Sequence, residues 1–158
     1  MTNIQDLSQK SKKAYVSWLE AQEWTFFITG STRYELTLKS LRRLMERWFE
    51  VVKTDGSRLF WAGEKFELKD GYHGHGLLYI PNDRLEIDPD NIFLFQRLVD
   101  AWQLMTGNKA VANHNGKIEW SKEGWNALHL KRFEKKRGGG GYCSKYVFKE
   151  GADYDLLC

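Results

Sequence analysis

The sequence predicts an α+β fold, in which an antiparallel β-sheet carries helices packed mainly on one face. Apolar residues recur at helical spacing in three long segments, and two strand-like runs flank a turn signal. A further apolar run, WTFFITG at residues 24–30, is ended by glycine and predicts a buried strand. With 158 residues and no linker-like stretch, the chain is expected to form one domain over residues 1–158.

The three helical segments are expected at residues 4–22, 37–52 and 91–106. In the second segment, the apolar side chains that fall in register are Leu38, Leu41, Leu44, Met45 and Trp48. Gly107 follows the third segment and is expected to end it, because glycine is the usual residue just past a helix C-terminus.

The remaining strands follow from turn signals and alternation. A β-hairpin is expected from residues 58–68 and 72–80, because Lys69-Asp70-Gly71 lies between these two strand-like runs. Two shorter strands are expected near residues 117–120 and 126–132, and GGGGYCSKYVFKE, residues 138–150, is expected to supply a last helix.

Composition limits the class of protein. The net charge is only +3, but a basic segment precedes the glycine run and could guide a phosphate backbone; its cations are Lys131, Arg132, Lys135, Lys136 and Arg137. No apolar stretch approaches the length of a membrane span, so no membrane partner is expected. The two cysteines form no CxxC motif and no signal peptide is present, which predicts a cytoplasmic protein.

His73-Gly74-His75 begins the second strand of the hairpin, and alternate residues of a strand point to the same face, so both imidazoles should project together. A connection of two or four residues brings Glu64 to the histidine face, diagonal to His75 or opposite it. A connection with an odd number of residues brings Glu67 opposite His73 instead. Glu64 is preferred as the third ligand, and Glu67 remains the alternative.

Two imidazoles and one carboxylate would leave coordination positions open. That arrangement is typical of a catalytic metal, since structural zinc is normally closed by four ligands and favours thiolates. Mixed nitrogen and oxygen donors suit a divalent cation, Mn²⁺ or Mg²⁺, and the sequence does not choose between them.

A repeated Tyr-x-x-Lys pattern follows the glycine run. On a helix, one face would carry Tyr142, Lys145, Tyr146 and Lys149. The apolar side chains that point the other way, and would anchor the helix, are Cys143, Val147 and Phe148. The phenols and ammonium groups are therefore expected to face outward, either for chemistry or as the solvated face of an amphipathic helix.

Together these motifs resemble those of the HUH endonucleases, which initiate rolling-circle replication of single-stranded DNA viruses, phages and plasmids. WTFFITG is similar to their first-strand motif, and His73-Gly74-His75 to their paired metal histidines. Tyr142-Cys143-Ser144-Lys145 is similar to their nucleophile motif, and the doubled tyrosine pattern to the two-tyrosine initiators of small isometric DNA phages. Ala62-Gly63-Glu64 is similar to the segment with the glutamate ligand of circular single-stranded DNA virus initiators. One residue departs from the pattern: Gly74 stands where the family usually has a bulky hydrophobic residue.

The resemblance implies an RRM-like sandwich that nicks and rejoins single-stranded DNA at a specific site, with a divalent metal held by His73, His75 and Glu64. It implies attack by Tyr142 on the scissile phosphate, which leaves a 5′-phosphotyrosine on the protein and a free 3′-hydroxyl on the DNA. Tyr146 would be a second nucleophile. The lysines of the two repeats, Lys145 and Lys149, would stabilise the charge that develops during each attack.

The implied partner is single-stranded DNA at a replication origin, in an open or hairpin form, in the cytoplasm of a host cell. No GxxxxGK[ST] motif is present, so no helicase domain is expected, and a host or viral helicase and polymerase would act in trans. Two alternatives remain open: a transposition or DNA-mobilisation nickase with the same chemistry, and a nucleic-acid-binding domain without enzymatic activity.

Overall fold

The computed structural model describes residues 9–107, 127–133, 145–149 and 153–158. Its helices and strands, in chain order, are α1 (Gln9–Ala21), β1 (Phe26–Gly30), α2 (Leu38–Val52), β2 (Arg58–Lys65), β3 (Tyr72–Tyr79), α3 (Ile92–Thr106), β4 (Leu128–Arg132) and β5 (Tyr154–Leu157). Residues 4–8 of the first expected helix, the strand expected at 117–120 and Tyr142 lie outside the described residues.

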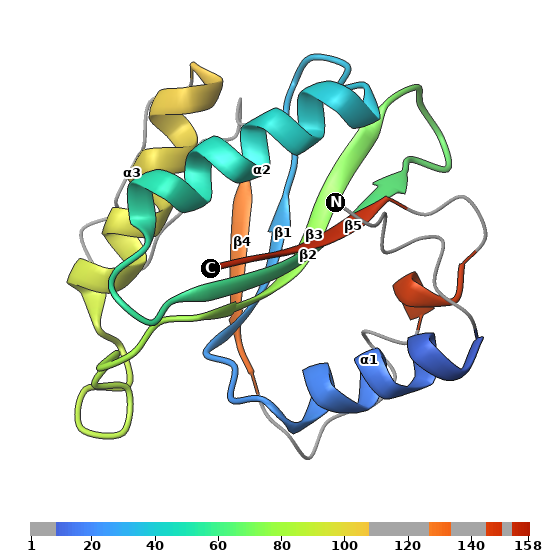
Figure 1. Ribbon diagram of the computed structural model, residues 1–158. Helices are drawn as coiled ribbons and strands as arrows, with labels where there is room; N and C mark the ends of the chain where they lie inside the picture. Colours follow the sequence, from blue (N-terminus) through green and yellow to red (C-terminus); the bar gives the residue numbers. More distant parts are fainter. Residues whose placement is uncertain (1–8, 108–126, 134–144, 150–152) are drawn as a thin grey trace.

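The strands form one antiparallel sheet in the order β4-β1-β3-β2-β5 (Figure 1). The α+β class and the antiparallel sheet are therefore confirmed. The edge strand β5 is not among the expected strands, since its four residues, YDLL, are too few to show an alternation. It pairs with β2, and Arg42 of α2 binds Asp153 and Asp155 on either side of its first residue.

Helices cover both faces of the sheet, which corrects the expectation that they pack mainly on one. On one face α2 and α3 enclose a core that includes Phe26, Trp48 and Trp102. On the other face α1 contributes Val16 and Leu19 to a second core around β2 and β3 (Figure 1). The physical reason is visible in β2, whose burial pattern shows apolar side chains buried on both sides, so neither face can be left to water.

Local signals set the helix ends close to their expected positions. The Thr37 side chain accepts a hydrogen bond from the backbone N–H of Ser40, whose hydroxyl in turn accepts from the Thr37 N–H, which forms a capping box at the start of α2. Asn91 caps α3, and Gly107 ends it in the left-handed conformation with φ of 84°. Within the described residues, no helix is both long enough and apolar enough to cross a membrane.

Candidate functional site

The hairpin of β2 and β3 places Glu64 directly opposite His73. Lys65 pairs with Tyr72, so the connection between the strands is the six residues 66–71, longer than the two or four that the sequence suggests. Its length is still even, and Glu64 therefore lies on the histidine face, opposite His73 and not His75. Glu67 lies within the connection, outside the ladder.

Glu64, His73 and His75 form a compact group that could hold a metal ion. Each offers one ligand atom, and these atoms lie within 4.8 Å of one another. The Nε2 atom of His75 is 3.4 Å from Oε2 of Glu64, and the two imidazole rings have centroids 4.6 Å apart. All three side chains are only partly buried, so a ligand can reach them.

Thr29 of β1 holds the ring of His75 and was not singled out by its sequence. It pairs with His75 across the sheet, and its hydroxyl lies 3.1 Å from Nδ1. If Nδ1 carries the proton and donates to Thr29, Nε2 keeps its lone pair toward Glu64, the arrangement usual for a metal-binding histidine. The sequence feature that could have pointed to Thr29 is the alternation of side chains within WTFFITG, which puts Thr29 on the face opposite to Phe26 and Ile28.

The ring of His73 is held differently. Phe66, the first residue of the hairpin connection, stacks on it with ring centroids 4.3 Å apart. Nδ1 of His73 is buried and finds no hydrogen-bond partner in the described part of the chain. A buried nitrogen without a partner is unfavourable, and either a metal ion or a bound water would satisfy it. The donor set and this buried nitrogen both fit a divalent cation.

Tyr146 joins this group from a different part of the chain. Its hydroxyl donates a hydrogen bond of 2.7 Å to Oε2 of Glu64, and its ring stacks on that of His75 with centroids 5.9 Å apart. The side chain is 2% exposed and belongs to the core beneath α1. The expectation that Tyr146 faces outward is therefore wrong: Val147 and Tyr146 are both buried, because the segment at residues 145–147 lies against the sheet.

The other members of the tyrosine motif are less closely placed. Nζ of Lys145 lies 3.6 Å from Oε2 of Glu64 and 5.1 Å from the centre of the Tyr146 ring, and its side chain is 59% exposed. Lys149 is exposed, and no contact with the group is found in the described residues. Tyr142 lies outside the described residues, so its position relative to Glu64 stays a prediction.

The electrostatics of the group favour an anionic carboxylate beside neutral imidazoles. Burial raises the pKa of Glu64, but the hydrogen bond from Tyr146 and the charges of His75 and Lys145 outweigh it, so the pKa lies below its ordinary value. Burial and the charge of His73 lower the pKa of His75 to about 4. Burial also lowers the pKa of His73. Both imidazoles are thus neutral at pH 7 and have lone pairs for a metal.

Tyr146 is held in its protonated form. Burial raises its pKa above the ordinary value, and the hydrogen bond to Glu64 and the charge of that carboxylate raise it further. The phenol is therefore a weak nucleophile in this state and has to transfer its proton before it can attack an electrophile.

Gly74 lies between the two histidines and faces α2. A Cβ at this position would lie 2.9 Å from Sδ of Met45 and 3.4 Å from Cδ1 of Leu41. The glycine that departs from the HUH pattern is thus required by close packing of α2 on β3, and it leaves both imidazoles on the opposite face.

Fold and group together define an α+β protein whose sheet carries a His-His-Glu group able to hold a metal ion, with a buried tyrosine bound to the glutamate. Comparison with protein families, curated proteins and solved structures finds no match to this chain.

Proposed function

We propose that the protein is a metal-dependent, site-specific single-stranded DNA nickase and ligase that initiates rolling-circle replication. The observation that carries the proposal is the contact of Tyr146 with the candidate metal group: its phenolic oxygen is 2.7 Å from Glu64 and its ring lies on that of His75. A phenol, two imidazoles and a carboxylate in one place are the groups that the resemblance to HUH endonucleases requires.

Glu64, His73 and His75 would hold a divalent cation, Mn²⁺ or Mg²⁺, through one carboxylate oxygen and two imidazole nitrogens. When bound, the cation supplies positive charge that neutralises the scissile phosphate. Thr29 keeps the imidazole of His75 in place through Nδ1, and Phe66 does so for His73 by stacking.

In the proposed reaction the phenolic oxygen of Tyr146 attacks phosphorus in line with the 3′-oxygen. The bond between the phenolic oxygen and phosphorus forms, the bond between phosphorus and O3′ breaks, and O3′ takes up a proton to become a free hydroxyl. The phenolic proton must leave, and Oε2 of Glu64 is the acceptor already bonded to it. One phosphodiester replaces another, so attack by a 3′-hydroxyl reverses the step and rejoins the strand.

Lys145 supplies the mobile cation of the site. Its ammonium group is 3.6 Å from Glu64 and largely exposed, so it can move to a non-bridging phosphate oxygen when the DNA enters. Tyr142 would be the other nucleophile, which acts when a second strand has to be cut, and Lys149, the lysine of the second repeat, would help to stabilise the charge that develops at the phosphate. These two roles rest on the sequence pattern alone.

The experiment is to incubate the protein with a labelled pool of single-stranded oligonucleotides of random sequence, with and without Mn²⁺ or Mg²⁺, and to separate products on a denaturing gel. A protein–DNA adduct that survives denaturation is expected only with metal. It should be lost in Tyr146→Phe and kept in Tyr34→Phe, a matched change at an exposed tyrosine.

The variants also separate the two phenols. Loss of the adduct in Tyr146→Phe with retention in Tyr142→Phe makes Tyr146 the first nucleophile, and the opposite result gives that role to Tyr142. An adduct that persists in the double variant contradicts the proposal. DNA binding without any adduct would favour a non-enzymatic nucleic-acid-binding domain, whereas the sequence of the DNA that is cut would separate a replication initiator from a transposition or mobilisation nickase.

A further inference from the structure

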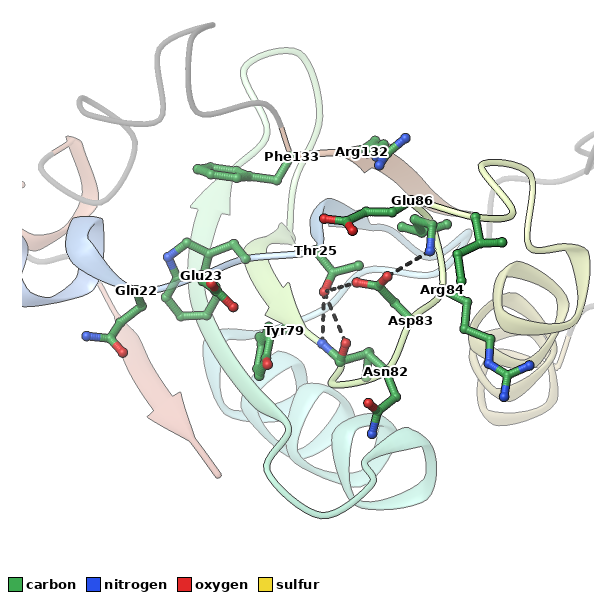
Figure 2. A pocket seen from close by; sticks show the side chains of 14 residues that line it. Gln22, Glu23, Thr25, Tyr79, Asn82, Asp83, Arg84, Glu86, Arg132 and Phe133 are labelled. Carbon is green, nitrogen blue, oxygen red and sulfur yellow. Dashed lines mark hydrogen bonds between the residues drawn. The ribbon is translucent and has the colours of Figure 1, made fainter.

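A cavity lies at the other end of β3 from the candidate metal group. It has a volume of about 810 Å³ and opens between residues 22–25, the end of β3 with the loop that follows it, and the end of β4 (Figure 2). Tyr79 lines the cavity, four residues beyond His75 on the same strand and about 13 Å away at the rise of an extended chain. The volume is within the range of small-ligand sites and is large enough for a nucleotide.

The aromatic lining of the cavity is on the same face of the sheet as the candidate metal group. Trp24, Tyr79 and Phe133 line the cavity, and all three belong to or pack against the core that contains Tyr146. The ring of Phe133 contacts that of Phe27, with centroids 5.0 Å apart. Phe27 in turn lies two residues from Thr29 on β1, so an aromatic surface joins the cavity to the site of His75.

Cations accompany this surface. Lys131 pairs with Phe27 across β1 and β4 and is exposed, and Arg132 lines the cavity. Aromatic rings interleaved with cations along one path are typical of surfaces that bind single-stranded nucleic acid, because rings stack on bases while cations contact phosphates. The ring of Tyr79 is held by Arg58, whose Cζ lies 4.2 Å from its centre.

The carboxylate of Asp83 lines the cavity, and its Oδ2 atom can accept a further hydrogen bond. Its Oδ1 accepts a hydrogen bond of 2.8 Å from the backbone N–H of Leu85. Its Oδ2 lies 3.4 Å from the hydroxyl of Thr25, which is equally far, at 3.5 Å, from the carbonyl oxygen of Ile80. One hydroxyl proton cannot serve both acceptors, and both distances are long, so Oδ2 retains free lone pairs beside the cavity (Figure 2).

The loop that carries Asp83 is held in a costly conformation. Its two neighbours, Asn82 and Arg84, have φ of 58° and 61°, in the left-handed region that arginine rarely adopts. Nδ2 of Asn91 also donates a hydrogen bond of 2.6 Å to the carbonyl oxygen of Asp83. The carboxylate is thus fixed in position, which a group that discriminates between ligands requires.

We propose that this cavity binds one nucleobase of the DNA strand whose phosphate reaches Tyr146, and that Asp83 selects a base with an exocyclic amino group. Guanine, adenine and cytosine can donate such a hydrogen bond to Oδ2. Thymine has only an N3–H between two carbonyl oxygens, which a carboxylate repels. The bound base would set which phosphodiester is presented for cutting, so the inference rests on the proposed nickase function and adds the source of its sequence preference.

The test is a binding selection that does not depend on cleavage. The double variant Tyr142→Phe/Tyr146→Phe is mixed with single-stranded oligonucleotides that contain a random segment, and the bound molecules are sequenced. Thymine should be depleted about tenfold at one position, the discrimination expected of a good base contact. In a second arm, DNA recovered from wild-type adducts should show the same depletion at a constant distance from the cut.

Asp83→Asn should abolish the depletion, because an amide Nδ2 donates where Oδ2 accepted, and thymine carbonyl oxygens then become partners. Preferences at all other positions should stay as in the parent protein. The matched control is Asp90→Asn, a change of the same charge in the same loop but outside the cavity. If Asp83→Asn does not fold, Asp83→Ser keeps an acceptor for the Leu85 N–H, removes Oδ2 and should have the same effect.

Arg132→Gln tests the phosphate contact. It should weaken binding of all sequences alike and lower the slope of log affinity against log salt by about 0.7, the value for one phosphate of a single strand. Base preferences that Asp83→Asn and Asp83→Ser leave unchanged would overturn the cavity proposal. Absence of any adduct from wild-type protein would overturn the nickase proposal alone, since the binding arm still measures base preference.

Discussion

Tyr146 and Glu64 are 82 residues apart in the chain, and the hydroxyl of Tyr146 donates a hydrogen bond of 2.7 Å to Oε2 of Glu64. The same carboxylate oxygen lies 3.4 Å from Nε2 of His75. Glu64 therefore connects the phenol to the candidate metal ligands. In the structure, Oε2 of Glu64 accepts the hydrogen bond of the phenol and raises its pKa. In the proposed reaction, the same oxygen would accept the phenolic proton.

Glu64 and not Glu67 should determine metal affinity. Glu64→Gln, which keeps the shape and removes the charge, should weaken Mn²⁺ binding by tenfold or more, as measured by calorimetry. Mn²⁺ should raise the melting temperature of wild-type protein, because a ligand that binds only the folded state stabilises it. Glu67→Gln, in the hairpin connection, is the matched control and should bind Mn²⁺ like wild type. Equal losses in both variants would contradict this ligand assignment.

Thr29→Val should reduce metal affinity without a change in any ligand. Valine matches threonine in shape but cannot bond Nδ1 of His75, so the imidazole loses its fixed orientation. A loss of about 10- to 100-fold is expected, the usual effect of removing the partner of a metal-bound histidine. Thr29→Ser restores the hydroxyl and should recover most of the affinity. A Thr29→Ser variant as weak as Thr29→Val would show that the methyl group, and not the hydrogen bond, matters.

Gly74→Ala should destabilise the fold although alanine is ordinarily the better residue in a strand. The new Cβ would meet Sδ of Met45 at 2.9 Å in a core where Met45 is fully buried. Overpacking of this kind costs about 1–3 kcal/mol of the free energy of unfolding, measurable with urea. The double variant Gly74→Ala/Met45→Ala should be less destabilised than the sum of the two single changes. Simple additivity would mean that these residues are not in contact.

The metal-free protein should lose stability as the pH falls from about 6.5 to about 4. Burial lowers the pKa of His75 to about 4 in the folded state, from 6.5 when unfolded. The unfolded chain then binds more protons than the folded one within this interval, so the contribution is complete above pH 6.5 and is lost toward pH 4. After allowance for solvent screening, the free energy of unfolding should fall by about 2 kcal/mol over this interval.

The measurement is urea unfolding in the presence of a chelator at several pH values. His75→Gln removes the titrating group and should flatten the dependence between pH 4 and 6.5. An equally steep dependence in that variant would assign the effect to other groups. His73 and His129, whose pKa values are also lowered by burial, act in the same direction and should contribute to the remaining slope.

The sequence alone was sufficient where only local geometry matters. The alternation of β3 puts His73 and His75 on one face, and an even connection brings Glu64 to that face whatever its length. Gly107 likewise ends α3 where the sequence predicts, because the hydrogen bonds that end a helix span only a few residues. The strand signal of β5 was too short to detect.

Only the tertiary structure decided which partners these residues meet. The six-residue connection of the hairpin puts Glu64 opposite His73, and Tyr146 points inward to Glu64. Thr29 lies beside His75, and Met45 packs against Gly74. Each outcome depends on burial of apolar surface by segments far apart in the chain. Apolar surface is buried only when these segments pack together, so the sequence of one segment by itself does not determine which partners it meets.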